Sequence, residues 1–501
     1  MNAAPGVKSV KIAVVGGGVG GMAAAYELKS EASRRGLELD LTVLESRDRI
    51  GGSVVTERVD GCLVEGGPDC FVSEKPWAME LVEELGLGDQ LVGTNDARRG
   101  TYVLWRGRPH PLPDGLILLV PTRIMPFVTA RLFTWRGKFR MALDLVLPRK
   151  SDGEDETLGD FIRRRLGGEA LDKLGEPLVA GIHSGDPETM SIRATFPRFV
   201  DMEREDRSLI VAMLKRMKAA RAARAAAEQT QAAAPSPGGE GQPAPRRRPR
   251  SMFVTLDEGL GLVMSELRRQ VGDESVRTGT RVTRVAAGPV SGWDVETEAG
   301  ETFHADGVLF ASPAYETAAM VRRLSGTLAA ELEDIPYVSS ATVTLAYSAA
   351  TFPSRLTGFG LVVPKGEHRR VKAFTWVTSK FFGRAPEDVV LMRCFIRATA
   401  GETEGMTEAE MAAAAQDELR DILGVAASPL WARAYRWDRA MAQYVVGHLA
   451  RVDRIDEELS AFRGLRLAGG AYRGTGIPDT VRYSRAQARA LLDDLTGRTE
   501  G

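Results

Sequence analysis

The chain has 501 residues, of which 44% are hydrophobic and 27% charged, and its formal net charge is −1. This composition is typical of a globular protein with two or three domains, and the balanced charge gives no basis for nucleic-acid binding. The three cysteines, Cys62, Cys70 and Cys394, have no CxxC spacing and there is no His-rich tract. We therefore expect no disulfide framework, no metal site, and a reducing, cytoplasmic location.

Targeting and membrane signals are weak. The N-terminal stretch lacks the long apolar core of a signal peptide, and the most apolar run, GLILLVP, is far shorter than the roughly 20 residues that a membrane span needs. No transmembrane helix is expected. Residues 115–133, where Arg123 and Arg131 interrupt apolar residues, fit two interpretations: a peripheral membrane contact, or a helix pair packed over a ligand cavity.

Local patterns divide the chain into several parts. Residues 8–45 predict a buried strand, a glycine turn, a helix and a second strand that ends at Glu45, which make one βαβ unit. From residue 98 to about 217 the pattern is mostly helical. Residues 219–250 contain no Val, Ile, Leu, Met or aromatic residue and predict a disordered linker. After it we expect short strands up to a buried one at 307–311, strands and one helix within 335–435, and a final strand, glycine turn and helix.

The first glycine turn fits the GxGxxG pattern at Gly16, Gly18 and Gly21. In dinucleotide-binding units the first glycine makes a tight turn, the second admits the pyrophosphate, and the third lets the helix pack on the strand. The helix N-terminus offers N–H groups to the phosphates. Glu45 is placed to accept hydrogen bonds from ribose hydroxyls. The pattern predicts a dinucleotide site, for either NAD or FAD.

Two further features favour FAD. Gly51 and Gly52 form a second close backbone approach shortly after the acidic residue. Gly474 and Gly476 precede a C-terminal helix, whose N-terminus can stabilise negative charge on a reduced flavin. No second GxGxxG lies between a strand and a helix, so we expect no separate NAD(P)H domain. The substrate itself would then reduce the flavin, as in an oxidase or a dehydrogenase.

Segments along nearly the whole chain resemble the FAD-dependent porphyrinogen oxidases of haem biosynthesis: VEGGPDCFVSEKP, GIHSGDPETMSIRATFP, EREDRSLI, RWDRAMAQYVVGH and GTGIPD. HPLPDGLILLVPTRIMPF and the GIPD ending are most similar to the bacterial coproporphyrinogen III oxidases, with the protoporphyrinogen oxidases as close relatives. The resemblance implies an α/β + α fold. It would comprise a discontinuous, Rossmann-like FAD domain of the p-hydroxybenzoate-hydroxylase type, a mixed-sheet substrate domain and a helical domain.

The resemblance also implies domain boundaries and cofactor contacts. The FAD-binding domain would comprise residues 1–90, 251–330 and 436–501. The helical domain would cover residues 91–217 and would carry the membrane contact if there is one. The disordered linker would cover residues 218–250, and the sheet-containing substrate domain would cover residues 331–435. The implied FAD contacts are Gly16, Gly17, Gly18, Val19, Gly20, Gly21, Glu45, Ser46, Ser53, Gly67, Pro68, Asp69, Cys70, Val282, Trp437, Thr475, Gly476 and Ile477.

The implied reaction converts coproporphyrinogen III to coproporphyrin III. Hydride leaves a methylene bridge for flavin N5, and oxygen reoxidises the flavin with formation of hydrogen peroxide. Because the cofactor carries this chemistry, no catalytic side chain is expected. The implied partners are the porphyrinogen, oxygen and, transiently, a ferrochelatase.

Three residues are candidates for substrate binding. Arg99 aligns with an arginine that binds a propionate in some relatives, but a plain surface arginine fits equally well. Lys75 could meet a propionate at the rim of the cavity or could be a solvated lysine at a helix start. His183, in GIHSGD, is expected near the cavity, with a packing and hydrogen-bonding role rather than that of a base.

Other functions remain open at this point. Protoporphyrinogen IX oxidase is the main alternative within the same class. An amine oxidase or a carotenoid desaturase-like flavoenzyme would fit the FAD motifs but not the GDxxxxSxxxTFP segment. A non-catalytic flavoprotein that docks partners through its Arg-rich linker is a further interpretation.

Overall fold

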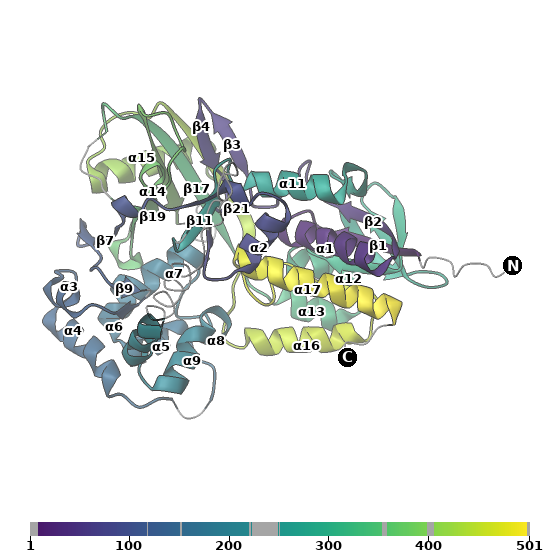
Figure 1. Cartoon of the computed structure of the whole chain (residues 1–501), viewed down its shortest axis with the longest axis horizontal. Coiled ribbons are helices and arrows are strands. Elements are labelled where there is room, and N and C mark those ends of the chain that lie inside the picture. Colours follow the sequence, from purple (N-terminus) through teal and green to yellow (C-terminus); the bar gives the residue numbers. More distant parts are fainter. Residues whose placement is uncertain are drawn as a thin grey trace, which may run out of the picture.

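A computed structural model of the chain describes residues 9–117, 119–150, 153–219, 222, 249, 251–352, 358–397 and 405–497. Its first sheet is parallel and has the strand order β12-β2-β1-β16-β22. Figure 1 shows this sheet and its helices at the right of the molecule. The strands are β1 (Ser9–Val15), β2 (Glu38–Leu44), β12 (Val276–Arg277), β16 (Gly307–Phe310) and β22 (Leu465–Leu467).

Both faces of this sheet are covered, which explains the continuously apolar strands. Ile12 and Val14 point into one core, and Ala13 and Val15 into another. The first core is closed by α1 (Val19–Arg35), α2 (Trp77–Glu84), α11 (Gly261–Val271) and α17 (Ile477–Thr496). The second is closed by α12 (Ala314–Val321), α13 (Gly326–Glu333), α16 (His448–Ser460) and the antiparallel strands β13 (Val282–Ala287), β14 (Trp293–Thr297) and β15 (Thr302–Ala305).

The chain also forms small sheets and short helical turns. The small sheets include β3 (Thr56–Val59) with β4 (Cys62–Glu65), and β11 (Phe253–Leu256) between β5 (Phe71–Val72) and β6 (Leu91–Gly93). The short helical turns are η1 (Gly88–Gln90), η2 (Asp96–Arg98), η3 (Leu143–Leu145), η4 (Leu171–Gly175), η5 (Asp273–Ser275) and η6 (Lys365–Glu367).

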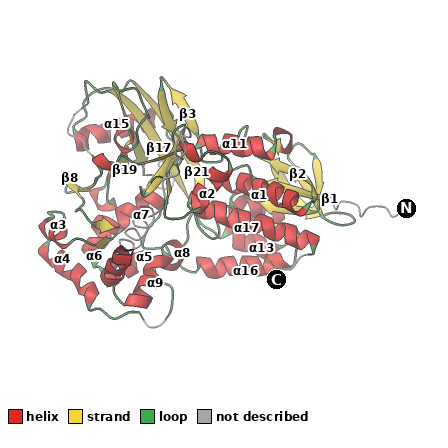
Figure 2. Ribbon diagram, in the orientation of Figure 1, coloured by secondary structure: helices red, strands yellow, loops and turns green. Residues whose placement is uncertain are grey.

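A second, mixed sheet has seven strands in the order β21-β17-β20-β19-β18-β7-β8. Figure 2 shows it at the upper left, above the helical part of the molecule. Its strands are β7 (Thr101–Trp105), β8 (Arg108–Pro111), β17 (Tyr337–Ser348), β18 (Gly360–Val362), β19 (Val371–Trp376), β20 (Val389–Ile396) and β21 (Trp431–Ala442), and its helices are α14 (Val377–Lys380) and α15 (Glu408–Leu423). Thr407 caps α15 in a capping box with Glu410, which satisfies backbone N–H groups at the start of this helix.

The start of the region expected to be helical differs from that expectation. Residues 101–111 form the hairpin β7–β8, and β7 pairs in parallel with β18. The apolar run at 115–121 forms two short antiparallel strands, β9 (Leu116–Ile117) and β10 (Val120–Pro121), instead of a helix. For β7, pairing with the distant strand β18 decided the outcome, and such pairing is not visible in the local pattern.

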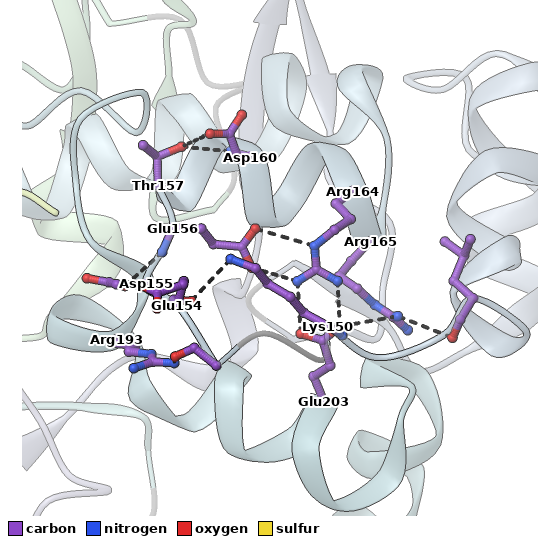
Figure 3. Close-up of polar contacts among 12 residues, drawn as sticks. Lys150, Glu154, Asp155, Glu156, Thr157, Asp160, Arg164, Arg165, Arg193 and Glu203 are labelled. Carbon is purple, nitrogen blue, oxygen red and sulfur yellow. Dashed lines mark hydrogen bonds and ion pairs between the residues drawn. The ribbon is translucent and has the colours of Figure 1, made fainter.

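The remaining helices surround a separate apolar core that contains Phe161, Phe199 and Met202. They are α3 (Ile124–Thr129), α4 (Trp135–Ala142), α5 (Leu158–Arg165), α6 (Gly168–Ala170), α7 (Glu176–His183), α8 (Ile192–Thr195), α9 (Pro197–Asp206) and a helix at 209–219. A polar network ties them together: Arg164 donates to Glu156 at 2.6 Å and to Glu203 at 2.5 Å (Figure 3). The predicted linker 218–250 lies outside the described residues, apart from 218, 219, 222 and 249.

Candidate functional site

The turn between β1 and α1 uses its three pattern glycines in different ways. Gly16 has a φ of +111°, and a Cβ there would lie 2.9 Å from the backbone of Ala311. A Cβ on Gly21 would lie 1.8 Å from the carbonyl oxygen of Gly16. For Gly18, in contrast, the nearest described atom to a Cβ is the Cα of Gly52, at 3.9 Å. Gly16 and Gly21 are therefore needed for packing, whereas Gly18 leaves open space for a ligand.

The open space lies at the N-terminus of α1. Gly18 is the N-cap residue, and among the described residues no side chain caps the helix there. The N–H groups of Gly18 and Val19 at this end of the helix are suited to an anion, whereas the Gly17 N–H is bound to Glu45. Gly20 faces the other way, since a Cβ on it would lie 2.9 Å from the Cα of Gly469 in the C-terminal segment.

Glu45 organises this turn from the end of β2. It is 7% exposed. Its Oε2 accepts a hydrogen bond from the Gly17 N–H at 2.6 Å, and its Oε1 accepts one from the Arg47 N–H at 2.9 Å and one from the Ser46 hydroxyl at 3.4 Å. Thr280 lies two residues before Val282, the first residue of β13. The Thr280 N–H donates to the Glu45 carbonyl oxygen at 2.8 Å. Predicted contacts from three separate segments thus meet here.

The second glycine pair lies directly against the first turn. The N–H of Gly51 donates to the Gly17 carbonyl oxygen at 2.8 Å, and Gly51 and Gly52 have φ values of +103° and +59°. Ser53 follows and is exposed. A Cβ on Gly67 would lie only 1.7 Å from the carbonyl oxygen of Ser53. This packing joins the glycine turns to the segment at 66–70.

The segment at 66–70 lies at the junction of the two large sheets. The Gly66 carbonyl oxygen accepts hydrogen bonds from Trp437 Nε1 at 3.0 Å and from the Thr342 hydroxyl at 2.8 Å. Arg393, which is 2% exposed, donates through Nη2 to the Gly67 carbonyl oxygen. Trp437 was predicted as an FAD contact, whereas Arg393 was not.

Asp69 is part of a buried charged group. Its Oδ2 lies 2.9 Å from Lys380 Nζ, which also donates to the Cys70 thiol at 3.3 Å. Burial alone would raise the pKa of Asp69, but Lys380 and Arg393 hold it below its usual range. Burial, together with the charge of Asp69, raises the pKa of Cys70 to about 12. The thiol therefore stays protonated at neutral pH and is no nucleophile.

The C-terminal glycine turn is held by a tyrosine. Gly474 has a φ of +128°, and its N–H donates to the Tyr444 hydroxyl at 2.7 Å. Thr475 follows, Gly476 is the N-cap of α17, and Ile477 is its first residue. This helix packs along α1, so the two helix N-termini belong to one region of the molecule (Figure 1).

The predicted substrate residues are spread around this region. Lys75 is ion-paired with Asp479 of α17, and its side chain is 46% exposed. Arg99 is 61% exposed and pairs with Asp96 at 3.0 Å. His183 is the last residue of α7, and its side chain lies outside the described part of the chain. The roles proposed for these three residues stay predictions.

Sequence reasoning missed several cations in and beside the second sheet: Lys372, Lys380, Arg384 and Arg393 are buried, and Arg397 is partly buried. Lys372 and Arg393 are the only charged residues in the apolar runs of β19 and β20, VKAFTW and VVLMRCFI. A charge within such a run is costly unless something compensates it. That pattern was the available signal.

Comparisons with known proteins agree with this geometry. The family described as flavin containing amine oxidoreductases matches residues 19–492. The chain belongs to this family. It is 32% identical to the coproporphyrinogen III oxidase of Bacillus subtilis (strain 168), over 97% of this chain and 98% of that protein. It is 34% identical to the coproporphyrinogen III oxidase of Propionibacterium freudenreichii subsp. freudenreichii, over 99% of this chain and 93% of that protein.

A solved structure gives the same result for the fold. The crystal structure of a candidate protoporphyrinogen oxidase from Exiguobacterium sp. 255-15 has a TM-score of 0.81 and 29% identity, and the match covers 97% of this chain and 100% of that one. The predictions of an α/β fold with a helical part and of FAD as the cofactor are confirmed. The family member described here is a flavin-dependent oxidoreductase, and the open space at Gly18 suits the pyrophosphate of FAD.

Proposed function

We propose that the protein oxidises coproporphyrinogen III to coproporphyrin III, with oxygen as electron acceptor and hydrogen peroxide as by-product. The observation that carries this proposal is the full-length similarity to two proteins named coproporphyrinogen III oxidase, at 32% and 34% identity. Each of the three two-electron oxidations removes two hydrogen atoms from the macrocycle and reduces one O2 to H2O2. When bound, FAD supplies the hydride acceptor for this reaction.

The residues of the chain would hold the cofactor in three places. The N–H groups of Gly18 and Val19 would bind the pyrophosphate, and Glu45 would bind the ribose of the adenosine half. The backbone of the segment at 66–70 and the N-terminus of α17 would contact the isoalloxazine half. The hydrogen bonds of Gly66 and Gly67 to the second sheet support this, because they fix that segment before the cofactor binds.

The test supplies the FAD-loaded protein with coproporphyrinogen III or protoporphyrinogen IX in air and follows porphyrin fluorescence and peroxide. We expect a higher kcat/KM with coproporphyrinogen III and one peroxide for each two electrons removed. A clear preference for protoporphyrinogen IX would replace the proposed substrate by the main alternative. Oxidation of neither porphyrinogen would refute the proposal.

We further propose that the protein touches membranes peripherally, through the surface of α3, α4 and the segment after η3. None of the described helices combines the length and the apolar character needed to cross a bilayer. However, this surface carries large exposed apolar side chains: Ile124 (78%), Met125 (69%), Trp135 (71%), Phe139 (69%) and Val146 (66%). The exposed Arg123, Arg131 and Arg136 lie in the same two helices and the segments beside them and suit anionic headgroups.

The helices of this surface are joined to each other, which supports a single docking face. Lys138 of α4 donates to the Val128 carbonyl oxygen of α3 at 2.6 Å. Trp135 and Phe139 lie four residues apart and so share one side of α4.

A transient contact with a ferrochelatase, which would use the porphyrin, is the remaining part of the proposal for partners.

A further inference from the structure

The two faces of the seven-stranded sheet are chemically different. On one face Val343, Cys394 and Ile396 pack with residues of α15 in an apolar core. Because successive side chains of a strand point to opposite faces, Thr342 of β17 and Arg393 of β20 lie on the other face, and Arg397, the residue directly after β20, continues this alternation. The bonds of Thr342 and Arg393 to the segment at 66–70 confirm this orientation. The second face is therefore the one toward the flavin site.

Lys372 lies at an irregularity of β19. Val371 pairs with Ile396 and Ala373 with Phe395, so Lys372 is an extra residue in a β-bulge. Bulges often re-aim a side chain next to a functional site. Lys372 is 5% exposed, and its Nζ donates to the Ser184 hydroxyl, just after α7, at 2.7 Å. Its side chain thus lies between the sheet and the helical part.

This lysine is a buried cation without a counter-ion. Among the described residues, no carboxylate lies within ion-pair distance of Lys372, and Ser184 is a neutral partner. Burial, and then the charge of Arg397, lower the pKa of Lys372 to about 8. An unpaired buried cation is costly, and an anionic ligand beside it would reduce that cost.

Arg397 adds a second positive charge nearby. Its Nη2 donates to the Val363 carbonyl oxygen at 3.0 Å, and its Nη1 lies 3.8 Å from Glu176 Oε1. Its Nε is buried and has no hydrogen-bond partner among the described residues. Glu176 also accepts a hydrogen bond from the Lys365 N–H at 2.8 Å, so this single carboxylate does not balance both cations.

Lys372 and Arg397 lie some distance along the sheet from the flavin site. Arg393, which holds the Gly67 carbonyl oxygen, precedes Arg397 by four residues, Arg397 follows directly after β20, and four residues of extended chain span about 13 Å. Phe395, which lies between these two arginines, and Thr375, which pairs with Arg393, are partly exposed although they lie in the middle of the sheet. The described residues leave this part of the face incompletely covered, over a length comparable with the width of a tetrapyrrole.

We propose that Lys372, assisted by Arg397, binds a propionate carboxylate of the porphyrinogen, on the side of the macrocycle remote from the flavin. This inference rests on the proposed function and adds to it a site for the carboxylates. A carboxylate at Lys372 Nζ would supply the missing counter-ion and fix the orientation of the macrocycle on the sheet. Lys372 is thus a specificity residue and takes no part in the redox step.

The test compares FAD-loaded wild type, Lys372→Met, Lys372→Gln and Lys372→Arg, with Lys365→Met as the matched control. Lys365 is a nearby lysine whose side chain is 69% exposed. Three quantities are measured: kcat and KM for coproporphyrinogen III, the affinity for coproporphyrin III from fluorescence quenching, and the melting temperature together with FAD content.

We expect Lys372→Met and Lys372→Gln to raise KM and to weaken coproporphyrin III binding by about 10- to 100-fold, as loss of a charge-assisted hydrogen bond does. The kcat and the FAD content should change little. Lys372→Met should melt at the same or a higher temperature, because it replaces an unpaired buried charge by an apolar side chain of similar shape. Lys372→Arg should keep most of the affinity, and Lys365→Met should behave as wild type.

Unchanged KM and unchanged coproporphyrin III affinity in Lys372→Met and Lys372→Gln would overturn the inference while the proposed function stands. A rise in KM accompanied by a lower melting temperature and loss of FAD would also overturn it, since that combination marks a structural lysine. If the wild type does not oxidise coproporphyrinogen III, the proposed function fails. The coproporphyrin III affinities then decide alone: a tenfold loss supports the carboxylate site and an unchanged value refutes it.

Discussion

The carboxylate of Glu45 accepts the backbone N–H of Gly17 at 2.6 Å, so the acid at the end of β2 fixes the glycine turn after β1. The same side chain holds the Arg47 N–H through its other oxygen. Two neighbouring loops of the candidate flavin site are thus oriented by one buried carboxylate, before any ligand is present.

Glu45→Gln should weaken FAD binding by about 10- to 100-fold, because bonds to a charged acceptor become bonds to a neutral one and one of the two donors is left facing an NH2 group. The measurement is FAD affinity by fluorescence titration of the apoprotein. Glu38→Gln, an exposed glutamate on the same strand, is the matched control and should bind FAD as the wild type does. Equal affinities for both variants would contradict the role given to Glu45.

Gly18→Ala should impair FAD binding, whereas Gly21→Ala should impair folding. A Cβ on Gly21 would collide with the Gly16 carbonyl oxygen at 1.8 Å, so we expect poor folding or a loss of stability of about 3 kcal/mol or more. A Cβ on Gly18 has 3.9 Å to the nearest described atom, so this variant should fold and melt near the wild-type temperature but bind FAD weakly. Circular dichroism melts and FAD content distinguish the two outcomes. A fully FAD-loaded Gly18→Ala would show that the pyrophosphate does not approach there.

Asp69→Asn should destabilise the protein by about 3 to 5 kcal/mol, because it leaves Lys380 and Arg393 buried without their carboxylate. The double variant Asp69→Asn/Lys380→Met should be less destabilised than Asp69→Asn alone, since both partners of the pair are then neutral. Chemical denaturation of all three variants, including Lys380→Met, gives the coupling energy. Additive effects would mean that the pair does not act as a unit.

His448 should make stability depend on pH. It is 1% exposed, donates to the Tyr472 carbonyl oxygen at 2.9 Å and stacks on Tyr444 at 3.8 Å between ring centres. Burial lowers its pKa from 6.5 to about 4. Between these values the unfolded chain binds a proton that the folded protein does not, so stability falls as the pH is lowered from about 6.5 to about 4, by up to about 3 kcal/mol from this residue.

The check on His448 is the loss of melting temperature between pH 7.5 and pH 5, in the wild type and in His448→Gln. Glutamine keeps a donor for Tyr472 but does not titrate, so the variant should lose less on acidification. His304→Gln, at a histidine whose side chain is 47% exposed, should keep the wild-type difference. An identical loss in His448→Gln would assign the acid sensitivity to other groups.

Trp135→Ser/Phe139→Ser should lower binding to vesicles of phosphatidylglycerol and phosphatidylcholine by at least about tenfold, because two large exposed apolar side chains are removed from the proposed contact face. Co-sedimentation with vesicles measures this. Phe382→Ser is the matched control, since Phe382 is 70% exposed but lies elsewhere. Absence of vesicle binding by the wild type would refute the membrane contact.

The local parts of the flavin site were predictable from the sequence. Its elements follow one another in the chain: the strand before Gly16, the helix after Gly18, and the acid at the end of the next strand. The periodicity of hydrophobic residues and the spacing of the glycines are therefore enough to find them. The glycine turn before α17 was found in the same way. Such signals work because the residues that make each turn are neighbours in the chain.

The parts built from distant segments were not predictable. Nothing in the run around Tyr102 indicates that it pairs with Leu361, and so a strand was missed where helices were expected. The position of Lys372 depends on a bulge that changes which way a side chain points, and the pairing of Asp69 with Lys380 joins two different parts of the molecule. These relationships depend on tertiary packing, which a local pattern does not contain.

The five-stranded sheet is closed at its edge by β22, and α17 follows directly. The ribosome therefore releases the first glycine turn long before its packing partners, Gly469 and α17, exist. During synthesis one side of α1 in the N-terminal βαβ unit therefore lacks its packing partner until nearly the whole described chain has emerged. Cofactor capture is accordingly a late event in biogenesis, and nascent chains stalled before Leu465 should leave the ribosome without flavin.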